Sequence, residues 1–228
     1  TPVKDISMKK IIITASDEKF SPIAMGLLRS LHQWDSPACD EVGMLDLGLS
    51  AQTRKAMEPY VTRFVEPGWD FDVSEVVKLE KPHVRALLAR PRLRDYFPGH
   101  DLYLWLDADM WLQERFPVDW FFDASRQGAM GLVPSADRSY VYHPSHIRWR
   151  QGNLLGYFGQ EALDLYALNP YYNAGAFSLR ADAPHWDAWG QYFVRALSVD
   201  PNRTSDQAIL NFMLWKESLP VHPLPSLC

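Results

Sequence analysis

The chain has 228 residues, of which 47% are hydrophobic and 13% aromatic, so it is long enough and apolar enough to bury a sizeable core. Its formal net charge is −5, and acidic and basic residues are interspersed without a basic block or an arginine-rich tail. This pattern argues against a nucleic acid as partner, because the phosphate backbone is bound mainly through clustered cations.

The first half of the sequence alternates short apolar runs with helix-like segments. Lys10–Ser16 predicts a strand, and Ser21 followed by Pro22 resembles the N-cap and first position of a helix. Alternating strands and helices predict an α/β fold with a mixed, mainly parallel central sheet flanked by helices. The further elements expected in this half are strands at 41–47, 62–66 and 102–107 and helices at 50–60 and 81–90.

The second half has a different character. The segment 128–133 predicts a strand, and the stretch 134–172 that follows is crowded with tyrosine, tryptophan and histidine. We expect irregular loop in that stretch, with one helix at 160–168. Beyond it the sequence predicts a strand at 174–179 and helices at 186–197 and 205–215, the last capped by Ser205. No linker is long or polar enough to separate two domains, so a single domain over 1–228 is expected.

The cysteine content and the lengths of the apolar runs indicate the expected cellular compartment. Cys39 and Cys228 are the only cysteines, which argues against a disulfide framework and against a thiolate zinc site. The N-terminal TPVKDISMKK lacks an apolar signal segment, and no run approaches about 20 apolar residues. The sequence therefore predicts a cytoplasmic protein without a transmembrane segment.

The run LYLWLDADMWL, residues 102–112, places two carboxylates inside a highly apolar segment. In a strand, Asp107 and Asp109 leave the backbone in the same direction. Two like charges in one partly buried space are unfavourable unless a cation neutralises them or one carboxylate is protonated. The pattern therefore predicts either a divalent metal held by oxygen ligands or a carboxylate dyad for acid chemistry. The alternative is a strand that ends near Leu106, with both acids in a solvated loop.

Ligands of open α/β sheets gather beyond the carboxyl ends of the strands. Ser16 closes the first predicted strand, and Asp107 closes the fourth. If these strands are parallel, Thr14, Ala15 and Ser16 share one crevice with Asp107 and Asp109. Such a crevice would suit a nucleotide diphosphate with its metal.

Four sequence features follow one another in the order found in a known family of proteins. They are the strand IIITAS, the helix start Lys81-Pro82, the acidic run LWLDADMWL, and the later pair YYNAGAFSLR and TSDQAILNFML. In this order they resemble the nucleotide-sugar glycosyltransferases of the GT-A fold, and most of all the retaining family 8 type and its bacterial relatives. Asp-x-Asp alone is common in unrelated proteins, so the succession of segments over almost the whole chain carries the resemblance.

The resemblance implies a set of donor contacts. Asp107 would contact the donor ribose and the metal, and Asp109 would bind the metal, Mn²⁺ or Mg²⁺, which bridges the diphosphate. Hard oxygen ligands suit these ions, which offset the charge that develops on the departing nucleoside diphosphate. Thr14 and Ala15 would line the uracil and ribose pocket, and Lys81 would reach the diphosphate or the sugar. A solvated lysine at a helix start is the alternative for Lys81.

Two later pairs are implied to surround the transferred sugar. Asn173 and Gly175 match a strand that approaches the donor sugar, where glycine lets the backbone come close to a ligand. Asp206 would bond sugar hydroxyls, and Gln207 would stabilise the oxocarbenium-like state from below. The structural alternatives are a tight entry into a buried strand for the first pair and, for Asp206, a first-turn charge that favours the helix dipole.

One departure from the resemblance concerns the metal. The family completes its metal site with a histidine from a C-terminal His-x-x-Gly-x-x-Lys-Pro-Trp segment, and this sequence has no such segment. His222 lies in the unrelated context PVHPLP. Either the chain is a piece of a longer protein, or another residue supplies the third protein ligand.

The implied function is that of a metal-dependent hexosyltransferase. It would move a hexose from a nucleotide sugar, a UDP-sugar by the resemblance, to a hydroxyl of a carbohydrate or glycoconjugate acceptor, with retention of configuration. The nucleotide-binding half would then cover about 8–112, and the acceptor-side half about 113–228. Sugar rings stack on aromatic side chains, so the aromatic stretch is the expected acceptor region, with Trp149, between Arg148 and Arg150, exposed and functional.

Two other functions remain open at this point. A nucleotidyltransferase that makes a nucleotide sugar would share the sheet and the metal-binding acids. It usually carries a glycine-rich basic loop after the first strand, however, and SDEKFSP lacks one. The third possibility is a catalytically silent module that binds a nucleotide or a sugar.

Overall fold

The computed structural model describes residues 8–34, 37–135 and 143–226. Its strands are β1 (Lys10–Ser16), β2 (Glu41–Asp46), β3 (Arg63–Val65), β4 (Leu102–Leu106), β5 (Met130–Pro134), β6 (Tyr172–Arg180) and β7 (Val221–Pro223). They form a seven-stranded sheet in the order β3-β2-β1-β4-β6-β5-β7. Among these described strands, β6 alone runs antiparallel to its neighbours, and every other pairing is parallel. The predicted mixed, mainly parallel sheet is therefore confirmed.

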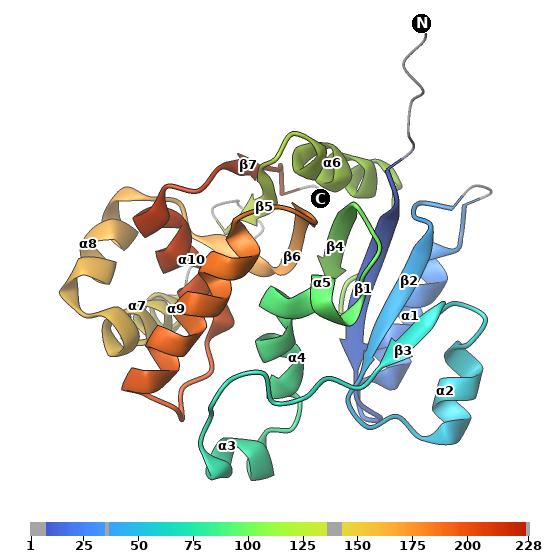
Figure 1. Ribbon diagram of the computed structural model, residues 1–228, viewed down its shortest axis with the longest axis horizontal. Coiled ribbons are helices and arrows are strands. Elements are labelled where there is room, and N and C mark those ends of the chain that lie inside the picture. The colour runs from blue at the N-terminus through green and yellow to red at the C-terminus, as the bar shows by residue number, and fades with distance from the viewer. Residues whose placement is uncertain (1–7, 35–36, 136–142, 227–228) are drawn as a thin grey trace, which may run out of the picture.

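Helices flank this sheet, as the sequence also predicted (Figure 1). α7, α8, α9 and α10 lie together at one end of the molecule, and α1 and α2 lie near β2 and β3 at the other (Figure 1). None of the helices in the described ranges is long and apolar enough to cross a membrane. Their bounds are α1 (Ser21–Leu31), α2 (Ala51–Met57), α3 (Glu75–Glu80), α4 (Val84–Ala89), α5 (Leu93–Tyr96), α6 (Phe116–Arg126), α7 (Pro144–Phe158), α8 (Gln160–Leu168), α9 (His185–Val199) and α10 (Asp206–Glu217), with a 3-10 turn at Arg90–Arg92.

The cap predicted at Ser205 is confirmed, because its side chain accepts a hydrogen bond from the Ala208 N–H at the start of α10. Ser50, predicted as the first residue of a helix, instead caps α2 and accepts from the Thr53 N–H. In α1 the pattern is shifted by one position, because Ser21 is the first helical residue rather than the cap. These elements begin within one or two residues of the expected positions, which is the usual precision of helix boundaries.

The helix predicted at 81–90 is wrong at its start. Lys81 is instead the C-cap of α3, and its N–H donates to the Val77 carbonyl at 2.9 Å. Proline disfavours helical backbone in the residue before it, and Lys81 accordingly has φ −134° and ψ 58°. Pro82 therefore opens a turn, and α4 begins only at Val84. α3 was not predicted, although Ser74 caps it.

Within the stretch 134–172 the predicted helix at 160–168 is confirmed as α8, but the expectation of irregular loop before it is wrong for 144–158. α7 occupies 144–158 and α8 follows directly, separated by Gly159, whose φ is +73°. Polar side chains cover most of α7, and its few buried residues lie toward its C-terminal end, so the apolar period was hard to recognise. Tyr140 and Tyr142, which belong to the predicted aromatic stretch, lie outside the described residues, as does Cys228.

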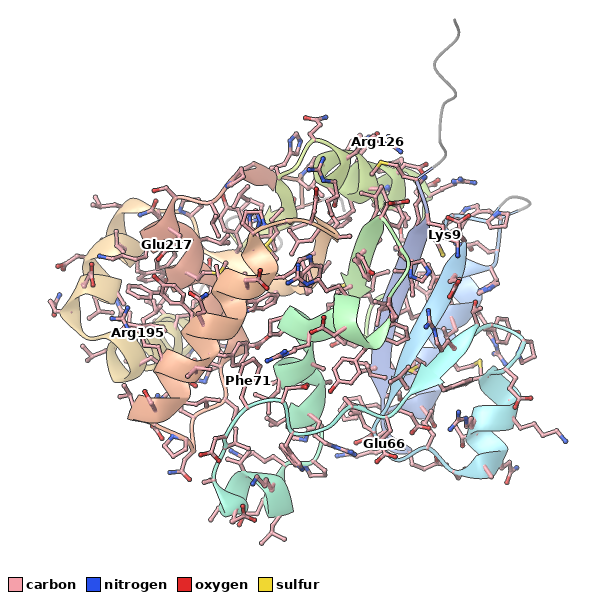
Figure 2. The ribbon with its side chains drawn as sticks, in the orientation of Figure 1. Lys9, Glu66, Phe71, Arg126, Arg195 and Glu217 are labelled. Atoms are coloured by element: carbon pink, nitrogen blue, oxygen red, sulfur yellow. The ribbon has the colours of Figure 1, made fainter. Side chains whose placement is uncertain are left out.

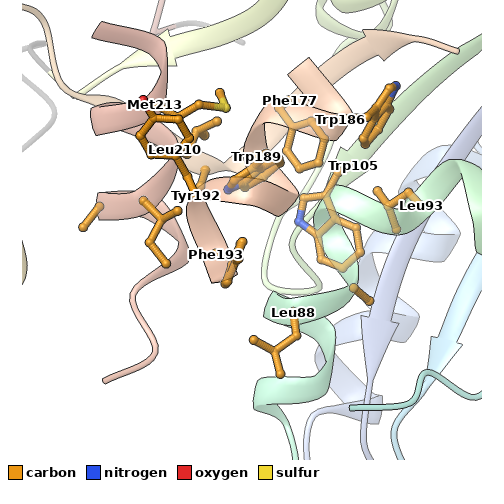
Figure 3. Packing of buried hydrophobic residues seen from close by; sticks show 14 of the residues in the cluster. Leu88, Leu93, Trp105, Phe177, Trp186, Trp189, Tyr192, Phe193, Leu210 and Met213 are labelled. Atoms are coloured by element: carbon orange, nitrogen blue, oxygen red, sulfur yellow. The ribbon is translucent and has the colours of Figure 1, made fainter. Parts of the chain in front are cut away.

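Side chains of β4 alternate between two hydrophobic clusters. Leu102, Leu104 and Leu106 pack in a cluster with residues of α1 and α6. Tyr103 and Trp105 point the other way, into a larger cluster with residues of α4, α9 and α10. Figure 3 shows the Trp105 ring among side chains from these helices. Asp107, two positions after Trp105 and just beyond the end of β4, lies on the same side and accepts a hydrogen bond from the Trp105 indole N–H.

The segment between β3 and α3 packs against the larger cluster through Phe71. Figure 2 shows Phe71 beside α9, where its ring stacks on Phe193 at a centroid distance of 4.9 Å. Phe71 is 7% exposed. This contact connects the chain that leads into α3 and Lys81 with the helices that precede α10.

Candidate functional site

A cavity of about 250 Å³ lies at the carboxyl ends of β1 and β4. The sheet continues through β2 on one side of β1 and through β4 on the other, which makes this the point where the strand order reverses. Open α/β sheets bind their ligands at such points. Ala15 and Ser16 line the cavity together with Asp107, Asp109 and Arg90, and we call it the acidic cavity. The sequence predicted this meeting of β1 with the two acids.

β4 ends at Leu106, so both acids lie in the turn that follows it. Asp109 is exposed and forms no hydrogen bond or ion pair within the described ranges. Asp107 is held more firmly, because its N–H donates to the Gly175 carbonyl at 2.8 Å and its Oδ1 accepts from the Trp105 indole N–H at 2.8 Å. The predicted strand is therefore one residue too long, and the alternative of a strand that ends near Leu106 is correct. A solvated position is found for Asp109 but not for Asp107, whose side chain is 34% exposed.

Arg90 is the residue that sequence reasoning missed. Its side chain is 5% exposed and forms ion pairs with both Asp107 and Asp206. Its guanidinium also lies over the Trp105 ring, 4.8 Å from the centroid. A signal was present in the sequence, because Arg90 follows the apolar run 86–89, and a cation that a helix carries into the core must find an anionic partner there.

The charges of these groups depend on one another. Burial raises the pKa of Asp107, and the neighbouring Arg90 guanidinium opposes that rise. Burial alone would lower the pKa of Arg90, but Asp107 and Asp206 together raise it above its ordinary value, so Arg90 stays charged. Asp107 and Asp206 pair with one guanidinium, and Asp109 lines the same cavity as Arg90 without pairing with it. These three carboxylates and one guanidinium carry two formal negative charges in excess, which a divalent cation would balance.

An irregularity in β6 brings its backbone against Asp107. On β5, Leu132 pairs with Phe177, but the next residue, Val133, pairs with Asn173, so three residues of β6 bulge between them. Gly175 lies in this bulge, and a Cβ built on it would be 2.8 Å from Oδ2 of Asp107. A larger residue here would force the carboxylate of Asp107 to shift, so glycine allows its close approach to β6.

Asn173 and Gln207 hold the bulge from two directions. The Asn173 side chain accepts a hydrogen bond from the Gly175 N–H at 2.8 Å. From the first turn of α10, Gln207 reaches across to β6, where its Oε1 accepts from the Ala174 N–H at 3.4 Å. Asp206, 6% exposed, lies beside it and pairs with Arg90. The structure thus connects Asn173, Gly175, Asp206 and Gln207 to Asp107.

A second cavity, of about 350 Å³, adjoins the start of α10. It is lined by Lys81, by Trp149 and Asn153 of α7, and by the segment 200–205, and we call it the Trp149 cavity. Trp149 is 56% exposed, as predicted. Lys81 lines this cavity and not the acidic one, so its predicted contact with the donor diphosphate stays a prediction.

Two other predicted positions lie away from the cavities. Thr14 is 1% exposed and lines neither, and its Oγ1 has no hydrogen-bond partner within the described residues, so its contact with a nucleotide also stays a prediction. His222 is exposed on β7, paired with Gly131 of β5, and likewise lines neither cavity. It is therefore no substitute for the missing third metal ligand.

The donor atoms in the acidic cavity fit a metal that shares its coordination with a substrate. The described residues contain no group of three or more His, Cys, Asp or Glu side chains that could hold an ion by themselves. They do offer Asp109, which is unengaged, and Asp107, whose Oδ1 is occupied by Arg90 and Trp105. Mg²⁺ is commonly bound through one or two carboxylates together with phosphate oxygens, which is the arrangement these two residues allow.

No protein-family model and no curated protein matches this sequence. Solved structures of low sequence identity do match its fold. The galactosyltransferase LgtC, crystallised with donor and acceptor sugar analogues, is 18% identical with a TM-score of 0.59, over 89% of this chain and 70% of that one. The bifunctional glycosyltransferase WbbM is 13% identical with a TM-score of 0.61, over 97% of this chain and 40% of that one.

A third match is the core-mannan synthase CmsA from Aspergillus fumigatus in its Mn/GDP form. It is 11% identical with a TM-score of 0.52, over 94% of this chain and 71% of that one. Together these matches show that the chain has the GT-A fold of nucleotide-sugar glycosyltransferases, and they confirm the predicted resemblance at the level of the fold.

Proposed function

We propose that this chain is a metal-dependent glycosyltransferase that moves a hexose from a UDP-sugar to an acceptor hydroxyl. The observation that carries the proposal is the acidic cavity, where Asp107 and Asp109 meet the end of β1 and where Arg90 connects Asp107 to Asp206. Its fold is shared with LgtC, which was crystallised with donor and acceptor sugar analogues. CmsA, of the same fold, was crystallised in a Mn/GDP form.

In this proposal the acidic cavity binds the nucleoside diphosphate. Ala15 and Ser16 contact the nucleoside, and Asp107 and Asp109 hold Mn²⁺ or Mg²⁺. The metal, when bound, offsets the negative charge that develops on the leaving diphosphate. Arg90 acts as a positioning residue, because it fixes the carboxylates of Asp107 and Asp206 relative to each other.

The groups around the β6 bulge face the transferred sugar in this proposal. Asp206 offers a carboxylate to sugar hydroxyls, and Asn173 offers an amide. The carbonyl oxygen of Gln207 is oriented toward the positive charge that grows at the anomeric carbon, an interaction that is stronger in the transition state than in the ground state. Its hydrogen bond to the Ala174 N–H is long, at 3.4 Å, so the side chain is positioned without being tightly engaged.

Retention of anomeric configuration is the expected stereochemical result. Asp206, the buried carboxylate next to Gln207, is paired with Arg90 and is therefore not free to act as a nucleophile. A front-face departure of the diphosphate is therefore favoured over a double displacement through an enzyme nucleophile. NMR of the first-formed glycosidic linkage tests this, and an inverted product would contradict it.

Asp109→Asn is expected to abolish the metal dependence of UDP binding, because an amide cannot replace the anionic oxygen that balances the metal's charge. The test is calorimetric titration of UDP with and without Mn²⁺. Asp123→Asn is the matched control, since Asp123 is exposed on α6, lines neither cavity and undergoes the same charge change. Unchanged Mn²⁺-dependent affinity in a folded Asp109→Asn protein would rule out the metal assignment.

A further inference from the structure

The wall of the Trp149 cavity is rigidly built. Arg203 donates through Nη1 to the Gly152 carbonyl at 3.2 Å and to Asn153 Oδ1 at 3.3 Å. Its guanidinium also packs over Gly156, where a Cβ would be 2.9 Å from Cζ. The Tyr157 hydroxyl donates to the Arg203 carbonyl. These contacts clamp the segment before α10 onto α7, so the cavity is a preformed site.

Of the three charged residues that line this cavity, Asp200 and Arg203 pair with each other, and Lys81 has no partner within the described ranges. Asp200, the carboxylate of the lining, is fully engaged: Oδ1 accepts from the Asn202 N–H at 3.1 Å, and Oδ2 accepts from Arg203 Nε at 3.2 Å. The ammonium group of Lys81 forms no hydrogen bond or ion pair within the described ranges. Lys81 is therefore the charge of the lining that is left for a ligand.

An aromatic surface faces the same cavity. Trp149, Asn153 and Gly156 follow one another at spacings of four and three residues, so they lie on one face of α7. Asn153 and Gly156 both contact Arg203. Trp149 itself is 56% exposed. Its indole can stack on the C–H face of a sugar ring, while Asn153, Asn202, Thr204 and Ser205 contribute polar groups around it.

We propose that the Trp149 cavity binds the acceptor, and that this acceptor is a saccharide bearing a phosphate or carboxylate group which pairs with Lys81 while its ring stacks on Trp149. The inference rests on the proposed function, because it assigns the class of acceptor. A local cation is needed for such a ligand, since the chain carries a net charge of −5 and would otherwise repel an anion. The cavity reaches Ser205, the residue before Asp206, and the proposed function assigns Asp206 to the transferred sugar.

Direct binding of matched sugars tests this. Methyl glucoside, methyl glucuronide and glucose 6-phosphate are titrated into the wild-type protein by ligand-observed NMR, with and without UDP and Mn²⁺. We expect at least one anionic sugar to bind about 5- to 10-fold more tightly than the neutral one, between the effect of an exposed ion pair and that of a charged hydrogen bond. The preference should weaken as salt is added. The carboxylate and phosphate arms show which anion fits.

Variants separate the two contacts. Lys81→Gln should remove the preference for anionic sugars, Lys81→Arg should retain it, and Trp149→Ala should weaken anionic and neutral sugars by the same factor. Lys55→Gln is the control, because Lys55 is an exposed lysine of α2 that lines neither cavity. Equal binding of neutral and anionic sugars by the wild type, or no binding of any of them, would overturn the proposal.

UDP affinity, measured on the same proteins, distinguishes this proposal from the proposed function. The acceptor assignment replaces the donor contact that the resemblance implied for Lys81, so Lys81→Gln should leave UDP binding unchanged. If it weakens UDP and leaves the sugar preference intact, Lys81 serves the donor diphosphate and the acceptor assignment is wrong. If the wild type binds no UDP, the glycosyltransferase proposal fails, while the sugar titration without nucleotide still decides the charge preference of the cavity.

Discussion

Arg90→Met is expected to lower the free energy of unfolding by about 3 kcal/mol, because it leaves Asp107 and Asp206 without their shared buried cation. The lower end of the usual range for a broken buried ion pair applies, since the Asp107 side chain is 34% exposed. For a chain of this length the melting temperature should fall by roughly 6–12 °C. Urea and thermal denaturation measure both quantities.

Arg85→Met is the matched control. Arg85 lies on α4 in the same segment and pairs with Glu66 at 3.1 Å, but Glu66 is 76% exposed, so this ion pair should contribute less than about 1 kcal/mol. Adding Asp206→Asn to Arg90→Met should recover part of the lost stability, because it removes one of the two unpaired charges. Equal destabilisation by the Arg85 and Arg90 substitutions would contradict the central position given to Arg90.

Gln207→Ala should lower kcat by roughly 10- to 10³-fold, in line with the loss of one electrostatic stabiliser of the transition state. Its effect on stability should stay below about 1 kcal/mol, because the hydrogen bond that it removes, from the Ala174 N–H, is 3.4 Å long. Donor affinity should change little. Turnover per folded molecule and the unfolding free energy are measured on one preparation.

Asn211→Ala gives the opposite pattern and serves as the control. Asn211 lies one turn further along α10, is fully buried, and bonds to both the N–H and the carbonyl of Tyr172 at 2.7 and 2.9 Å. Its loss should cost about 1–3 kcal/mol of stability and leave turnover per folded molecule intact. A destabilised but normally active Gln207→Ala protein would remove Gln207 from the catalytic residues.

The fold could be predicted from the sequence where patterns are local and strong. The apolar run of β4 and the cap at Ser205 each mark an element directly, and both elements are found. α7 was not predicted, because its polar sequence hides the helical period. α3 was not predicted, because Lys81-Pro82 was interpreted as the start of a helix, although proline disfavours helical backbone in the residue before it.

The site could be predicted in part for a similar reason. Asp107 and Ala15 were placed correctly because the strand ends of a parallel sheet meet at one edge. Arg90 was not predicted, since its role depends on a pairing with Asp206 across 116 residues of sequence. The bulge that aims Gly175 at Asp107 likewise depends on the register between β5 and β6, which no local pattern specifies.

The most direct test of the proposed function is nucleoside diphosphate release from a panel of UDP- and GDP-hexoses in the presence of Mn²⁺. Our account predicts slow hydrolysis of at least one UDP-hexose without acceptor, loss of this hydrolysis when Mn²⁺ is chelated, and a strong decrease in the Asp109→Asn and Gln207→Ala variants. Binding of UDP without turnover of any donor, under conditions where the protein is folded, would instead identify a silent nucleotide-binding module and contradict the assignment of a glycosyltransferase.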